Sequence, residues 1–153
     1  MATTCDLQEL SKAITKGQKG IGKIGKSLPV LHTVLLRRVN SHVEVVGTDM
    51  EKWARGTCRA IATDRAGDDK TLWEICVRPK DLKDWLAAWE VKGKGIREVT
   101  LRINQPEAYK IDPSLIVEYK DSPGLSGQAT FKGIDGQEFP YIDFEARKDD
   151  EVN

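Results

Sequence analysis

The chain has 153 residues, of which 39% are hydrophobic and 31% are charged. Its 24 basic and 24 acidic side chains give a formal net charge of zero, which argues against a polyanion-binding role for the surface as a whole. No apolar run approaches the roughly 20 residues that a membrane span requires, and residues 1–10 do not resemble a secretory signal. We expect one soluble cytoplasmic domain with no membrane partner.

The cysteines and histidines are few and widely spaced. The three cysteines are Cys5, Cys58 and Cys76, and no CxxC pair occurs. This spacing favours small apolar residues on strands over a disulfide framework or a zinc site. His32, His42 and Asp49 are the one set that could bind a metal, if the two histidines face each other across a hairpin. We expect no metal and no cofactor.

A short helix is expected near the N-terminus. Residues 1–5 predict a strand, and apolar residues then recur at helical spacing from Leu7 to Lys16. Asp6 suits the N-cap, and Glu9, three residues later, completes a capping-box pattern. Gly17 is the expected C-terminal stop.

A glycine-rich loop follows, from Gln18 to Ser27. Gly20 to Ser27 formally matches GxxxxGKS, the phosphate loop of nucleotide hydrolases. The context differs, because a helix is expected before the loop and Leu28-Pro29 follows directly after it. A small nucleotide-phosphate hydrolase using residues 20–27 is therefore the alternative from the enzyme class.

The stretch from Ser27 to Glu51 predicts a hairpin. An apolar run, Val30 to Val39, is followed by a turn at Asn40 and Ser41 and by an alternating strand around Val43 and Val45. Thr48 and Asp49 can cap their own backbone at the end of the second strand. This capping role accounts for Asp49 without catalysis.

The remaining elements follow in order. They are strands Lys52–Thr63 and Thr71–Val77, a helix Lys80–Glu90 entered at Pro79, strands Glu98–Asn104, Ser114–Lys120 and Gln128–Ile134, and a closing turn Phe139–Ile142. The order β-α-β-β-β-β-α-β-β-β predicts an α+β fold with both helices on one side of antiparallel sheets. We expect a single domain over residues 1–145 and a solvated acidic tail over residues 146–153.

Four tryptophans could stack on single-stranded nucleic acid. Trp85 and Trp89 share the apolar stripe of the second helix, and Trp53 and Trp73 lie on predicted strands. These positions favour core packing.

Several short motifs resemble the N-terminal domain of the bacterial sliding clamp, the beta subunit of DNA polymerase III. They are Leu28-Pro29-Val30-Leu31, Val34-Leu35-Leu36, Val43-Glu44-Val45, Gly47-Thr48-Asp49-Met50-Glu51, Val77-Arg78-Pro79-Lys80 and Glu138-Phe139-Pro140. Each motif is weak alone, but their shared order covers residues 3–143. The resemblance implies a non-enzymatic DNA-clamp domain, with its helices facing the central hole of a ring.

The resemblance also implies partners and a site. The partners would be double-stranded DNA, a DNA polymerase or clamp-loader-type protein, and further copies of the chain in a ring, in the nucleoid-associated cytoplasm. The DNA-facing candidates are Lys12, Lys16, Lys19, Lys23, Lys26, Lys80 and Lys83. Lysines on a helix face and a loop contact phosphates without reading bases, which permits sliding. A clamp-derived module that binds proteins but not DNA is the second alternative.

Overall fold

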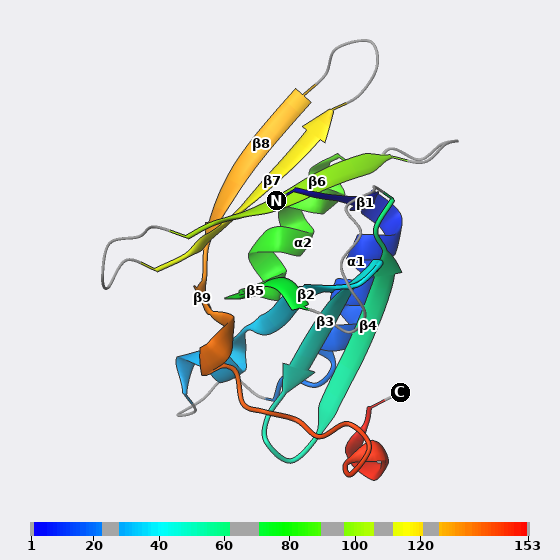
Figure 1. Cartoon of the computed structure of the whole chain (residues 1–153), viewed down its shortest axis with the longest axis vertical. Coiled ribbons are helices and arrows are strands. Elements are labelled where there is room, and N and C mark those ends of the chain that lie inside the picture. The colour runs from blue at the N-terminus through cyan, green and yellow to red at the C-terminus, as the bar shows by residue number, and fades with distance from the viewer. Residues whose placement is uncertain are drawn as a thin grey trace.

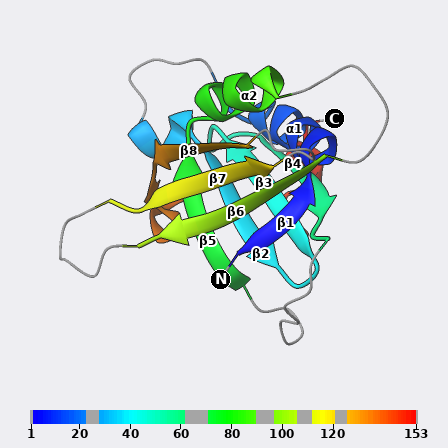
Figure 2. The same cartoon turned by 90° about the horizontal axis from the view of Figure 1, so that it is seen from above.

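The computed structural model describes residues 2–22, 28–61, 71–89, 97–105, 112–120 and 126–152. Two helices lie on the same side of two antiparallel sheets (Figures 1 and 2), which confirms the predicted α+β class. The elements are β1 (Thr3–Asp6), α1 (Leu7–Gln18), the 3-10 helix η1 (Pro29–His32), β2 (Val34–Val39), β3 (His42–Thr48), β4 (Trp53–Arg59), β5 (Thr71–Val77), α2 (Pro79–Ala88), β6 (Glu98–Asn104), β7 (Ser114–Lys120), β8 (Ser126–Lys132), β9 (Ile134–Asp135), and the 3-10 turns η2 (Gly136–Glu138) and η3 (Lys148–Asp150).

The chain folds as two β-α-β-β-β units that exchange their first strands. One sheet has the order β1-β6-β7-β8 and the other has the order β4-β3-β2-β5-β9. β1 pairs antiparallel with β6, and β5 pairs antiparallel with β2. Each sheet therefore takes its first strand from the other unit, so neither unit completes its sheet alone.

The main core lies between the helices and the sheets. α1 buries Leu7, Leu10 and Ile14 completely, and α2 buries Leu82 and Leu86. These side chains pack in one cluster with residues from both sheets. Removing apolar surface from water in this way is the main driving force for folding, so this cluster stabilises the domain more than its polar contacts do.

The N-terminal cap of α1 is the predicted one, whereas its C-terminal end differs from the prediction. Asp6 caps the helix as predicted, because its Oδ2 accepts from the Glu9 backbone N–H at 3.0 Å. The predicted stop at Gly17 is wrong, since α1 continues to Gln18. A Cβ at Gly17 would lie 2.7 Å from the carbonyl oxygen of Val45. This glycine therefore permits close helix–sheet packing.

The predicted hairpin forms, but its first strand is shorter than expected. The turn falls at Asn40, which has a φ of 51°. The apolar run begins as η1, and β2 starts only at Val34. Pro29 favours this because it has a fixed φ and lacks the N–H that a strand would use. The Thr33 hydroxyl then donates to the Val30 carbonyl at 2.6 Å and ends the 3-10 turn.

Three other predicted boundaries shift. The third strand covers Trp53–Arg59, inside the predicted range, and residues 62–70 lie outside the described ones. The second helix runs from Pro79 to Ala88, with Trp89 as its C-cap. The last predicted strand divides into β8 and β9 on different sheets, separated by Gly133.

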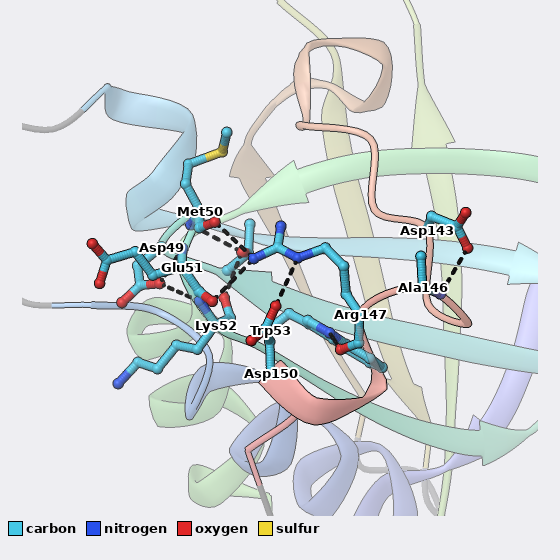
Figure 3. A network of polar contacts seen from close by, with 10 residues as sticks. Asp49, Met50, Glu51, Lys52, Trp53, Asp143, Ala146, Arg147 and Asp150 are labelled. Atoms are coloured by element: carbon cyan, nitrogen blue, oxygen red, sulfur yellow. Dashed lines mark hydrogen bonds and ion pairs between the residues drawn. The ribbon is translucent and has the colours of Figure 1, made fainter.

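The C-terminal strap, residues 136–152, packs against the outer face of the second sheet. Arg147 Nη2 donates to the carbonyls of Met50 at 2.7 Å and Glu51 at 3.0 Å, and the Trp53 indole donates to the Arg147 carbonyl at 2.6 Å (Figure 3). The Val152 N–H donates to the Trp53 carbonyl at 2.8 Å. These hydrogen bonds hold the backbone of Arg147 and Val152 against the second sheet, and most of the side chains in residues 146–152 are exposed.

Candidate nucleic-acid interface

The exposed face of α1 brings three of the predicted lysines together. Its buried residues contact β3 and β4, so the opposite face points away from the sheets. Lys12, Lys16 and the C-cap residue Lys19 recur every three or four positions on that face. They line an open hollow of about 460 Å³.

Three neutral polar side chains that were not predicted from the sequence share this hollow. Gln8, Ser11 and Thr15 line it together with the three lysines, and no carboxylate of the described residues does. Their spacing from Lys12 and Lys16 follows the same helical period, which would have identified them. We call these six residues the α1 polar face. Its lysines supply positive charge, and the Gln8 amide and the Ser11 hydroxyl can donate hydrogen bonds, whereas the Thr15 hydroxyl already donates to the Ser11 carbonyl at 3.0 Å.

The second helix has a different charge pattern. Lys80 is exposed and pairs with Asp84 at 2.9 Å. The hydrogen bond from Lys80 to Asp84 raises the pKa of Lys80 above its usual value. Lys83 is half-buried, and Asp81 is exposed. α2 therefore presents acidic groups beside its lysines, whereas the α1 polar face consists of lysines and neutral side chains.

The last two predicted lysines, Lys23 and Lys26, lie outside the described residues. The described chain on either side of them contains α1 before the loop and η1 followed by β2 after it. A phosphate loop instead connects a strand to a following helix. The order of elements therefore counts against the nucleotide-hydrolase alternative.

Solved structures of sliding clamps have the same arrangement of helices and sheets. The beta subunit of DNA polymerase III from Pseudomonas aeruginosa superposes with a TM-score of 0.66, at 21% identity over 94% of this chain. The Caulobacter crescentus beta subunit gives 0.63, at 17% identity over 93% of this chain. The Bartonella birtlesii sliding clamp, bound to griselimycin, gives 0.62 at 17% identity over 93% of this chain. This chain has the sliding-clamp fold.

The likeness is one of fold and covers only part of each clamp. The chain spans 32% of the length of each of these three proteins. No protein-family model and no curated protein sequence matches it. In the described part of the chain, no helix is both long and apolar enough to cross a membrane.

The alternative metal site does not form. His42 pairs with Val39 beside the hairpin turn, whereas His32 precedes β2 at the opposite end of that hairpin. The two histidines therefore do not face each other. Asp49 instead caps its turn, with its Oδ1 accepting from the Glu51 and Lys52 backbone N–H groups at 3.0 and 2.8 Å. No group of three metal-binding side chains forms among the described residues.

All four tryptophans contribute to core packing, as predicted. Trp53 and Trp73 are buried, and Trp85 and Trp89 pack against the main core. The Trp89 ring lies 4.8 Å from the Tyr119 ring, between centroids. This contact occupies one face of the Trp89 ring, which a base-stacking platform would leave exposed.

The cysteines are buried, and all three are free thiols. Burial raises the pKa of Cys76 to about 12, from an ordinary value of 9.0. A reactive cysteine would need the opposite shift, since the thiolate is the nucleophile. The positions of the three cysteines on β1, β4 and β5 match the prediction of small apolar strand residues.

Alkaline unfolding provides a test of the buried Cys76 thiol. Between pH 9 and pH 12 the unfolded chain loses this proton before the folded chain does, so the free energy of unfolding falls as pH rises. We expect Cys76 to contribute a slope of up to about 1.4 kcal/mol per pH unit. Urea unfolding across this range should give a flatter profile for Cys76→Ala than for the wild type. Equal slopes in the two proteins would contradict the assignment.

Proposed function

We propose that this chain is a non-enzymatic DNA-clamp domain. It lines or encircles duplex DNA without sequence preference and tethers a polymerase or another DNA-processing partner. The observation that carries the proposal is the α1 polar face, which points away from the sheets and lines its hollow with lysines and neutral polar groups. The sliding-clamp fold supports the same assignment.

The chemistry of this face suits phosphates better than bases. Lysine is a mobile point charge, so Lys12, Lys16 and Lys19 can follow a phosphate backbone as it moves. Contacts to phosphates position a protein on a duplex but do not select a sequence. Non-specific contacts of this kind also allow movement along the DNA.

The proposed ring requires more than one such domain. This chain spans 32% of the length of the clamps it resembles, so we propose that further copies complete the ring. The expected setting is the nucleoid-associated cytoplasm, with polymerase or clamp-loader-type proteins as partners. DNA contacts by Lys23, Lys26, Lys80 and Lys83 belong to the same proposal.

Fluorescence anisotropy with two labelled duplexes of unrelated sequence tests the DNA assignment. We expect equal affinities, with dissociation constants on the order of 10⁻⁵ M at physiological salt and much tighter binding at low salt. A strong preference for one sequence, or an affinity that does not change with salt concentration, would contradict the proposal.

Light scattering over a range of concentrations tests self-assembly. A strictly monomeric protein at high concentration would exclude the self-assembled ring.

Calorimetry with ATP and Mg²⁺ separates the clamp from the nucleotide-hydrolase alternative. A clamp domain should show no heat of binding. Nucleotide binding together with absent DNA binding would favour the hydrolase. Absent DNA binding without nucleotide binding would favour the protein-interaction module.

A further inference from the structure

A second hollow lies on the face of the second sheet opposite α1, between that sheet and the C-terminal strap. Its volume is about 600 Å³, within the range of ligand-binding pockets. Leu35 and Val46 form its floor, whereas their neighbours Leu36 and Val45 face the main core. We call this hollow the strap pocket. It is apolar at its base and separate from the α1 polar face.

The wall of the strap pocket has an excess of negative charge. Glu74, Asp143 and Glu145 line it, and Arg37 is its one cationic lining residue within the described part of the chain. Arg37 lies between Glu44 and Glu74 on neighbouring strands, and its guanidinium pairs with Glu44 at 3.0 Å. The pocket therefore combines an apolar floor with acidic walls.

The three wall carboxylates differ in how their charge is balanced. Glu145 pairs with Lys148 at 3.0 Å. Among the described residues, no basic group lies within ion-pair distance of Glu74 or Asp143. Carboxylates at the wall of an apolar pocket favour a cationic ligand and repel phosphate groups.

The strap offers an exposed aromatic ring and open backbone groups at the pocket. Tyr141 is 89% exposed, the highest value among the exposed large hydrophobic side chains of the described chain. Tyrosine is enriched at protein–protein interfaces. The described residues also provide no backbone hydrogen bond for Tyr141 or Ile142. Such groups can pair with an extended peptide.

We propose that the strap pocket binds a short basic peptide segment of a partner protein. An aliphatic or aromatic side chain of the peptide packs on Leu35 and Val46, and a neighbouring lysine or arginine approaches Glu74 and Asp143. The peptide backbone pairs with the strap next to Tyr141. Because the pocket and α1 lie on opposite faces of the second sheet, one chain can bind this peptide and a duplex together.

Two capped hexapeptides, GLKFKG and GLEFEG, test the proposal by NMR titration of the isotope-labelled protein. The basic peptide should shift the backbone amides of Leu35, Val46, Glu74 and Tyr141, with a dissociation constant on the order of 10⁻⁴ M. The acidic peptide should bind about tenfold more weakly, because like charges meet at the wall. Equal binding of the two peptides, or shifts confined to other surfaces, would overturn the proposal.

Matched variants identify the charges responsible. Glu74→Gln combined with Asp143→Asn should weaken the basic peptide about fivefold, and the asparagine can still accept from the Ala146 N–H that Asp143 now binds at 3.2 Å. Glu9→Gln combined with Glu98→Gln removes the same charge from other surfaces and should leave binding unchanged. Equal weakening by both pairs would contradict a local site.

Tyr141→Ala provides a test that does not depend on the stability of the charge variants. The ring is 89% exposed, so its removal should leave the fold intact and weaken the basic peptide. Unchanged peptide binding would exclude Tyr141 from the site. If the free protein dimerises and Tyr141→Ala restores the monomer, the pocket is an interface between copies and the peptide proposal fails.

Discussion

Reversing the charge of Lys12 and Lys16 to glutamate should weaken duplex binding by on the order of a hundredfold at low salt. Both side chains are exposed on α1 and lie one turn apart, so neither substitution disturbs the core. The logarithm of the affinity falls linearly with the logarithm of the salt concentration. Each lost phosphate contact makes this slope shallower by about 0.9. Anisotropy titrations at several salt concentrations should therefore show a slope reduced by about 1.8. Adding Lys19→Glu should deepen both effects.

The matched control for this experiment is Lys132→Glu combined with Lys148→Glu. These lysines are exposed on β8 and on the strap, and the substitutions change the net charge by the same amount. The control should retain most of the affinity, because its charges lie off the α1 polar face. An equal loss in both variants would mean that net charge, and not this face, governs binding. Circular dichroism of each variant verifies that α1 remains helical.

The order of elements could be predicted because each element has a local signal. Asp6 and Glu9 mark the start of α1, and Asn40 marks the hairpin turn, where its positive φ is tolerated. The exchange of β1 and β5 between sheets has no local signal. It depends on pairings such as Cys5 with Val99 and Leu36 with Ile75, which join residues far apart in the sequence.

The α1 polar face could be predicted in part from the sequence, in the same way as the order of elements. Helical spacing placed Lys12 and Lys16 on one exposed face, and it also places Asp84 one turn from Lys80, with which it pairs at 2.9 Å. The strap pocket was not predictable, because its floor and walls come from three strands and from a segment near residue 140. The sequence predicted a closing turn at Phe139–Ile142 and a tail only from residue 146, and the docking of Arg147 on the Met50 carbonyl depends on tertiary contacts alone.

Gly20→Ala should lower the free energy of unfolding by about 2 to 3 kcal/mol, the upper part of the range for overpacking. A Cβ at Gly20 would lie 2.1 Å from the Gly47 carbonyl oxygen and 2.5 Å from the Ala54 backbone nitrogen. Both contacts are with backbone atoms of the sheet, so the end of α1 would have to move away from β3 and β4. Urea unfolding should show a lower midpoint with an unchanged slope.

This substitution also separates the two explanations of the glycine-rich sequence, because Gly20 is the first residue of the GxxxxGKS match. Gly22→Ala is the control, since its nearest contact would be the Cβ of Asp49 at 2.9 Å, a smaller overlap than the 2.1 Å approach at Gly20. We expect Gly22→Ala to cost less stability than Gly20→Ala. If Gly20→Ala instead left stability unchanged and removed ATP binding from the wild-type protein, the glycine would belong to a phosphate loop. A loss of stability in a protein that never bound ATP would assign Gly20 to helix–sheet packing, which holds the α1 polar face in position.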